Sequence, residues 1–167
     1  MRRHLFAALV LVLLAAMESS LLPSLLGNLP RPSLVLIVSS TWAALRGNEG
    51  LMWAAFGGLC LDFVSSAPFG MHLLSLTTGN AIAALVDQIP NPIPLLRATN
   101  WTAVATALFF AVSLTILTLV QHPVSIPYAL ESAVLPAIII NPSLAIPTYL
   151  VLSRLEAQLR RQERALP

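Results

Sequence analysis

Hydrophobic residues gather into six runs along the chain, and short breaks rich in glycine, proline or charge separate these runs. A helix needs about 20 apolar residues to cross roughly 30 Å of hydrocarbon. Each run therefore predicts one transmembrane helix, although the second run is clearly shorter than that. The predicted helices cover residues 4–26, 33–45, 50–66, 71–86, 101–121 and 128–152.

Prolines shape the third and sixth predicted helices. The residue before a proline is driven away from helical geometry, so the third helix should end ahead of Pro68. The sixth run contains Pro136, Pro142 and Pro147. A proline inside a helix removes a backbone N–H donor and crowds the preceding turn. We therefore expect the sixth helix to be kinked or broken, with neighbouring helices satisfying the freed carbonyl groups.

The composition favours a membrane protein over a soluble one. Hydrophobic residues make up 57% of the 167 residues and charged residues 10%, whereas a soluble domain carries about 25% charged residues. So few charges cannot cover the surface of a soluble protein. The one cysteine, Cys60, has no partner for a disulfide bond within the chain. The sequence thus predicts an all-α polytopic membrane protein with a six-helix transmembrane domain over residues 1–153.

The basic residues, all of them arginines, predict the orientation of these helices. With both termini in the cytoplasm, eight of the nine basic residues fall on the cytoplasmic side, and Arg31 alone falls outside. Cytoplasmic segments of membrane proteins carry such an excess of positive charge. We therefore predict that both termini are cytoplasmic. The arginines of the cytoplasmic side are Arg2, Arg3, Arg46, Arg97, Arg154, Arg160, Arg161 and Arg164.

Residues 154–167 form a short basic tail after the last predicted helix. Leu155 and Leu159 share a helical face, and arginines surround them. Glu156 precedes Arg160 by four residues, a spacing that supports a helix. Such an amphipathic basic helix can lie on anionic lipid, which is the interpretation that we favour at this point. A docking site for a cytoplasmic protein is the alternative.

Three acidic residues fall in the outer half of the predicted membrane domain. Counting about 1.5 Å per residue from the cytoplasmic helix ends places Glu18 and Asp62 about 20 Å from that side. Glu131 falls near the outer surface. A carboxylate in hydrocarbon is costly unless it faces protein or water. We therefore expect an acidic layer in which these side chains turn toward the bundle or toward a partner.

Asp62 ends a face of small residues on the third predicted helix. Gly50, Ala54, Gly58 and Asp62 are spaced by four residues and so share one side of the helix. Small residues at this spacing let a second helix approach closely. The sequence does not decide whether that helix belongs to the same chain or to a partner.

Two interpretations of Asp62 remain open. It can be an interaction site flanked by Ser65, or a structural carboxylate that caps the turn containing Pro68 and Gly70. In either case, replacement by alanine should disrupt assembly or function. Replacement by asparagine keeps hydrogen bonding and should be milder.

Residues that would indicate catalysis or metal binding are missing from the pattern. The histidines His4, His72 and His122 are far apart in the sequence, and no zinc, P-loop or glycine-rich phosphate motif occurs. Catalysis normally needs a nucleophile, a base and an orienting group together. We therefore expect no enzymatic activity, no metal, no cofactor and no nucleic-acid partner.

Three stretches resemble the rod shape-determining protein MreD family, a family of small multi-span proteins of the bacterial inner membrane. "RPSLVLI" is similar to the Arg-Pro that opens the family's second span, and "NPSLAIPTYLVLSRLEAQLRRQ" to its last span and basic tail. "GGLCLDFVSSAPFG" resembles the family signature most specifically, with Ser66 where that family often has glycine. The landmark residues are Arg31, Pro32, Asp62, Ser65, Gly70, Asn141 and Pro142.

The resemblance implies a function that the residue pattern by itself does not. MreD-like proteins are non-enzymatic scaffolds of the Rod complex, the elongation machinery that builds lateral peptidoglycan and maintains rod shape. They associate with MreC, a single-span protein. That assembly connects to the MreB filament inside the cell and to RodA with its penicillin-binding transpeptidase. We therefore expect MreC as the primary partner.

A small-molecule-binding function is the alternative. Substrate-binding membrane components of energy-coupling-factor vitamin transporters are also small six-helix bundles with a ligand site in the outer half. In that case the acidic layer of Glu18, Asp62 and Glu131 would belong to a pocket, and Thr77, Thr78 and Asn80 would help to line it.

Overall fold

The computed structural model describes residues 2–27, 29–86, 93–120 and 125–165, and side chains between residues 5 and 160 of these ranges. Within them the chain forms six helical passes joined by turns, and no strand occurs in this part. The first and last passes each contain a short π-helical segment. The elements are α1 (Arg2–Ala16), η1 (Met17–Leu21), α2 (Leu22–Leu26), α3 (Leu34–Arg46), α4 (Asn48–Val64), α5 (Met71–Val86), α6 (Pro94–Val120), α7 (Ile126–Ala129), η2 (Leu130–Val134) and α8 (Leu135–Ala165).

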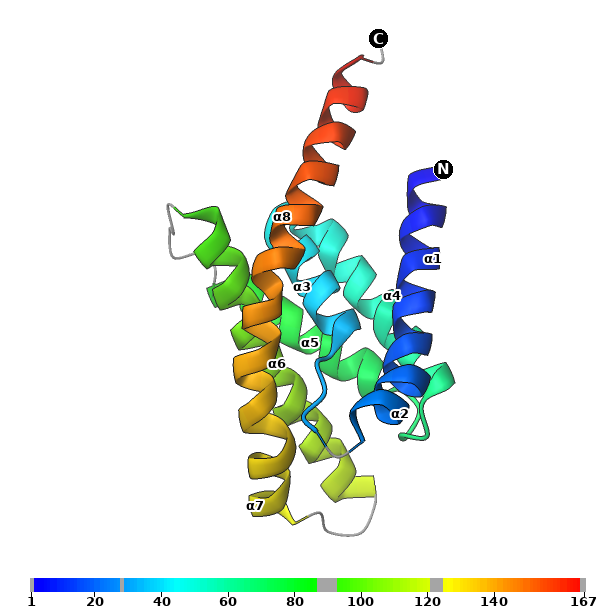
Figure 1. The fold of residues 1–167 in the computed structure, drawn as a ribbon, viewed down its shortest axis with the longest axis vertical. Helices are drawn as coiled ribbons and strands as arrows, with labels where there is room; N and C mark the ends of the chain where they lie inside the picture. Colours follow the sequence, from blue (N-terminus) through cyan, green and yellow to red (C-terminus); the bar gives the residue numbers. More distant parts are fainter. Residues whose placement is uncertain (1, 28, 87–92, 121–124, 166–167) are drawn as a thin grey trace.

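Successive passes run in opposite directions, so both chain termini lie at the same end of the molecule (Figure 1). Helix α3 has a central position and packs against α4, α6 and α8. Helix α5 lies between α4 and α6, and α1 packs mainly against α4. The expected all-helical architecture with six passes is confirmed.

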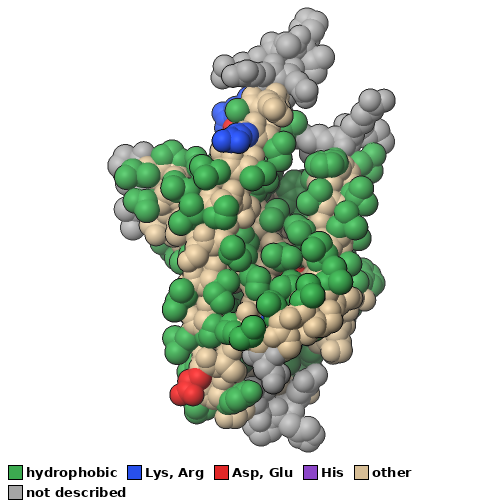
Figure 2. Space-filling view, viewed as in Figure 1, with side chains coloured by type: hydrophobic (Ala, Val, Ile, Leu, Met, Phe, Trp, Pro, Cys, Tyr) green, Lys and Arg blue, Asp and Glu red, His purple; other side chains and the backbone are tan. Residues whose placement is uncertain are grey.

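Three passes are long and apolar enough to cross a membrane by themselves, namely Leu5–Leu26, Pro94–Val120 and Ile126–Arg160. The inner helices α3 and α5 are shorter, with 13 and 16 residues. Thirteen residues extend only about 20 Å, so α3 begins inside the bundle rather than at its surface. Apolar side chains are spread over the surface that Figure 2 shows, and charged side chains appear there only in small patches.

The two π-helical segments share a sequence motif. Glu18-Ser19-Ser20-Leu21-Leu22-Pro23 and Glu131-Ser132-Ala133-Val134-Leu135-Pro136 both follow the pattern E-S-x-x-L-P. In each segment a backbone N–H bonds the carbonyl five residues earlier, just before the proline. A wider turn accommodates a proline because the proline ring crowds the preceding turn and donates no hydrogen bond.

Helix boundaries differ from the predictions mainly at α6 and α8. Helix α6 begins at Pro94 rather than at Trp101, because proline is well suited to a first helical turn, where its missing N–H has no partner to lose. Helix α8 continues from Leu135 to Ala165 through Pro142 and Pro147. The sixth helix is therefore not broken at these prolines, and it runs without interruption across the expected boundary between residues 153 and 154.

Glycines allow the inner helices to touch through their backbones. A Cβ atom added to Gly58 would lie 2.7 Å from the His72 carbonyl oxygen, and one added to Gly79 would lie 2.8 Å from the Ala105 carbonyl oxygen. The same atom on Gly50 would overlap the backbone of Ala43. Backbone atoms cannot move aside as a side chain can. These contacts bring α3, α4, α5 and α6 close together, as small residues do in membrane bundles.

Candidate functional site

Asp62 caps the N-terminus of helix α5. Its Oδ1 accepts a hydrogen bond from the backbone N–H of His72 at 2.9 Å, and its Oδ2 accepts one from the N–H of Leu73 at 3.1 Å. Met71 and Leu74 bond to carbonyls of the preceding turn, so the whole first turn of α5 is satisfied. The first N–H groups of a helix have no partner within the helix and carry partial positive charge. A buried carboxylate at this place is stabilised by both effects.

The turn between α4 and α5 holds Asp62 opposite that helix end. Ser65 ends α4 with an extended backbone, and its N–H bonds the Leu61 carbonyl. Gly70 has a φ of +90°, which favours glycine, and it directly precedes α5. The Pro68 carbonyl accepts the N–H of Met71 at 3.0 Å. Asp62 therefore binds the first turn of the helix that follows this turn, while the Ser65 hydroxyl has no hydrogen-bond partner among the described residues.

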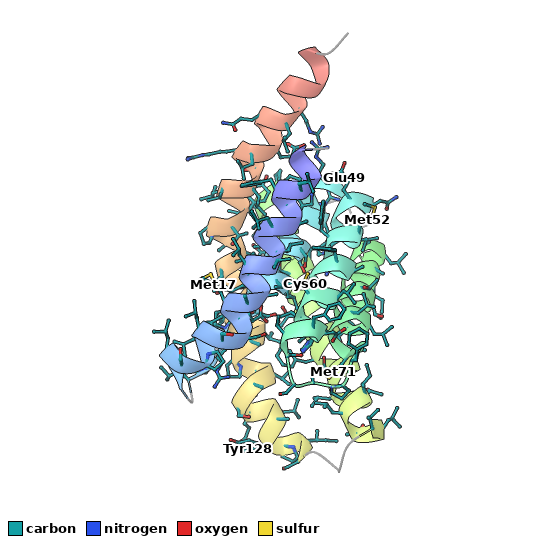
Figure 3. All side chains as sticks on the ribbon, turned by 90° about the vertical axis from the view of Figure 1, so that its right-hand side faces the viewer. Met17, Glu49, Met52, Cys60, Met71 and Tyr128 are labelled. Carbon is teal, nitrogen blue, oxygen red and sulfur yellow. The ribbon has the colours of Figure 1, made fainter. Side chains whose placement is uncertain are left out.

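Glu18 performs the same task for helix α3. Its Oε1 accepts a hydrogen bond from the Ser33 hydroxyl at 2.8 Å, and its Oε2 accepts one from the backbone N–H of Val35 at 3.0 Å. The π-helical segment η1 places this side chain beside the start of α3. Met17, the residue before Glu18, lies level with Cys60 of helix α4 along the long axis of the bundle (Figure 3). The first helical pass thus closes the N-terminus of the second.

Asn141 completes this second helix cap. Its Oδ1 accepts the Ser33 backbone N–H at 3.1 Å, and its Nδ2 donates to the Thr106 hydroxyl at 3.4 Å. Asn141 is fully buried. Helix α8 is thereby bonded to both α3 and α6. The adjacent Pro142 lies within the same helix.

Two further contacts join α5 to α6. The Ser113 hydroxyl donates to the Ser75 hydroxyl at 2.9 Å. The indole Nε1–H of Trp101 donates to the Asn80 side-chain oxygen at 3.0 Å. With the bonds of Glu18, Asn141 and Asp62, every pass is linked to a neighbour by at least one hydrogen bond, in the order α1, α3, α8, α6, α5, α4.

The remaining predicted residues lie apart from these contacts. Arg31 is exposed and donates to the Gly27 carbonyl at 2.5 Å, so it closes the end of α2, and Pro32 lies in the extended segment before α3. Glu131 is exposed on η2. The three acidic side chains therefore do not meet in one site, because two bind different helix ends and the third is exposed. Gly50, Ala54 and Gly58 face the interior of the bundle, where this side of α4 packs against α3 and α5 of the same chain.

A second polar cluster occupies the end of the molecule where both termini lie. Arg46 lies 3.6 Å from Glu49 and 3.6 Å from Glu156, and its guanidinium stands 5.9 Å from the ring centre of Trp42. Glu156 also pairs with Arg160. The turn between α3 and α4 is thus tied to helix α8, and Figure 3 shows Glu49 at this end and Tyr128 at the opposite end.

These contacts describe a structural rather than a reactive site. No group of three or more potential metal ligands occurs among the residues that the structure describes. The carboxylates of Glu18 and Asp62 each accept hydrogen bonds at the N-terminus of a helix. Asn80 is likewise used within the bundle, and Thr77 bonds the Leu73 carbonyl. Of the threonine and asparagine residues expected to line a vitamin pocket, Asn80 thus joins α5 to α6, whereas Thr77 bonds within α5.

The fold and these contacts define the class of a multi-pass helical membrane protein whose inner helices are joined by buried polar groups. A comparison with protein families matches residues 1–157 to the family described as rod shape-determining protein MreD. The chain therefore belongs to the MreD family, and this membership implies a role in determining rod shape. No curated protein and no solved structure gives a significant match.

The sequence pattern did not predict some of these contacts. Ser33, Trp101 and Ser113 were not singled out, nor was the pairing of Arg46 with Glu156. One signal was available for Ser33, since serine is a preferred residue ahead of a helix. The repeated E-S-x-x-L-P motif could also have marked the two π-helical segments. The remaining contacts join residues far apart in the chain and carry no local signal.

Proposed function

We propose that this chain is a non-enzymatic scaffold of the Rod complex in the bacterial inner membrane, where it pairs with MreC and helps to organise lateral peptidoglycan synthesis. The observation that carries the proposal is the family match over residues 1–157. Both termini would be cytoplasmic, as the distribution of arginines favours. RodA, its transpeptidase partner and MreB would be reached through the same assembly.

The internal hydrogen bonds support a pre-formed platform. Carboxylates at membrane depth are costly unless protein satisfies them, and here helices of the same chain bind those of Glu18 and Asp62. A single-span partner helix would therefore contact the apolar outer surface rather than the buried carboxylates. Exposed apolar side chains of this surface include Leu5, Phe6, Leu9, Leu13, Leu135 and Ile139.

Of the two interpretations of Asp62, this geometry favours the structural one. Both of its carboxylate oxygens bind α5 of the same chain. The face formed by Gly50, Ala54 and Gly58 is likewise occupied by α3 and α5. We infer that these residues affect complex formation indirectly, because they set the shape of the bundle that the partner binds.

Depletion of the protein in its native host, combined with a mild-detergent pull-down of the tagged chain, tests the proposal. We expect depleted cells to become round and MreC to be recovered with the wild-type chain. Rod-shaped growth of a clean deletion with an intact MreC complex would contradict it. In the same pull-down, Asp62→Ala should lower MreC recovery only in proportion to the loss of folded protein. If MreC recovery falls although the Asp62→Ala variant is fully folded, Asp62 contacts the partner directly.

A further inference from the structure

Helix α8 extends beyond the rest of the molecule at the end where both termini lie (Figure 1). It contains 31 residues, which is about 46 Å at 1.5 Å per residue and more than the hydrocarbon thickness of roughly 30 Å. Glu156 lies level with the turn between α3 and α4, since it pairs with Arg46. Residues 157–165 therefore project past that turn as a helix.

The pairing with Arg46 lies at the base of this projection. The Arg46 and Glu156 side chains are each only 12% exposed, and Trp42 lies against the same guanidinium. Partly buried ion pairs are weakened much less by solvent and salt than exposed ones. The ion pair thus ties helix α8 to the bundle at the base of the projecting residues.

The projecting residues are poorly suited to lie on lipid. An in-plane helix needs a continuous apolar face that can enter the headgroup boundary. Between residues 157 and 165, Leu159 is the only large apolar residue. The favoured interpretation from the sequence relied on Leu155 as well, but Leu155 lies before the projecting part, at the level of the ion pair.

The charge of the projecting helix indicates the chemistry of its partner. Arg160, Arg161 and Arg164 lie on it, with Glu163 as the one acidic residue of this stretch. Exposed Arg154 adds a fourth arginine just below. Arginine binds carboxylates through two parallel hydrogen bonds. An acidic protein surface therefore complements this helix.

We propose that residues 157–165 of α8 form an upright basic docking helix, positioned by the Arg46–Glu156 ion pair, for an acidic surface of a cytoplasmic protein. This goes beyond the association with MreC in the membrane, and it rests on the proposed cytoplasmic placement of the C-terminus. An anionic lipid surface is the competing occupant that the test must separate.

The experiment places a photo-crosslinking amino acid at Gln158 of the full chain in its native membrane. Adducts are separated by size and identified by mass spectrometry. We expect a discrete adduct with a cytoplasmic protein that presents acidic residues at the crosslinked position. Its yield should fall about tenfold in the triple variant Arg160→Gln, Arg161→Gln, Arg164→Gln, because glutamine cannot form the charge-assisted bonds that arginine makes with carboxylates. The matched triple lysine variant keeps the charge and should retain most of the adduct.

Glu156→Gln distinguishes a positioned helix from simple charge attraction. This change makes the tail more positive, so attraction to any acidic surface or lipid should be unchanged or stronger. A docking helix that depends on Arg46 should instead lose the protein adduct. Thermal unfolding of each variant confirms that it folds.

Lipid adducts alone, no protein adduct, or a protein adduct that persists in the triple glutamine variant would overturn the proposal. Labelling of Gln158→Cys with a membrane-impermeant reagent is measured separately in intact and in permeabilised cells. Labelling in intact cells would show that the C-terminus is not cytoplasmic, so the proposed orientation of the chain would be wrong.

Discussion

At the residue scale, two acidic side chains cap the first turns of helices α3 and α5. Asp62 and Glu18 each accept two hydrogen bonds from or beside the first turn of another helix. An unsatisfied backbone N–H in an apolar environment is costly. Each carboxylate therefore supplies the hydrogen bonds that the first turn of a neighbouring helix needs.

The two E-S-x-x-L-P motifs offer a matched test of this role. Glu18→Ala should leave the Ser33 hydroxyl and the Val35 N–H unpaired and lower the free energy of unfolding by about 1–3 kcal/mol. Glu131→Ala changes the same motif at an exposed position and should leave stability unchanged. Tryptophan fluorescence during thermal unfolding in detergent measures both. Equal destabilisation by the two variants would refute the capping role.

Asp62 allows a second test at the start of α5. Asp62→Ala removes the acceptor for two backbone N–H groups, and we expect a loss of about 2 kcal/mol or more. Asp62→Asn keeps one carbonyl acceptor and should be milder. The same unfolding measurement, with the amount of folded protein in the membrane as a second readout, compares them. Indistinguishable stability of both variants and the wild type would count against the assignment.

At the scale of elements, the helices pack so closely that single methyl groups matter. Gly58 lies against the backbone of α5, while the neighbouring Gly57 lies against the end of the Val35 side chain. An added methyl group at Gly57 displaces mainly one side-chain atom, whereas at Gly58 it displaces backbone atoms of α5. The two glycines therefore differ in tolerance even though they are adjacent in the sequence.

This difference predicts the outcome of an alanine pair. Gly58→Ala should separate α4 from α5, weaken the bonds of Asp62 and destabilise the protein by about 1–3 kcal/mol or more. Gly57→Ala should be milder, because the atom that it meets is the Val35 Cγ1. Unfolding temperatures of the two variants in the same detergent provide the comparison. A more harmful Gly57→Ala would show that the α4–α5 contact is wrongly described.

At the scale of the whole molecule, six passes of unequal length form one bundle with both termini at one end (Figure 1). The long passes present apolar side chains to the outside, and the short helix α3 is enclosed by α4, α6 and α8. The hydrogen bonds between successive neighbours make this enclosure specific, since apolar contacts alone do not fix which helices pair in a membrane.

The proposed orientation predicts which residues a membrane-impermeant maleimide can reach. In a Cys60→Ala background, Ser66→Cys in the exposed α4–α5 turn should be labelled in intact spheroplasts. Asn48→Cys, beside the α3–α4 turn, should be labelled only after permeabilisation. The physical reason is the excess of arginines at the end that holds the α3–α4 turn. The reverse pattern would invert the topology.

The sequence predicted the number and class of helices better than their ends. Apolar runs located all six passes, because hydrocarbon thickness imposes a length and composition that can be read locally. The predicted bounds of helix α5 agree with the observed ones. The predicted start of α6 is too late, because the proline-rich stretch before it indicates a connector, whereas the helix already begins at Pro94. The prolines of α8 did not break it, since neighbouring helices can compensate for a lost backbone bond.

The sequence by itself determined that this chain is an all-helical, six-pass protein with an aspartate on a face of small residues, because composition and period are local properties. Only the tertiary structure decided what Asp62, Glu18 and Asn141 do. Their partners lie on other helices, and hydrogen bonds between such helices depend on how the passes are arranged in space. The contact of helix α8 with the α3–α4 turn was decided in the same way, by an ion pair between Arg46 and Glu156, two residues that more than a hundred positions separate in the chain.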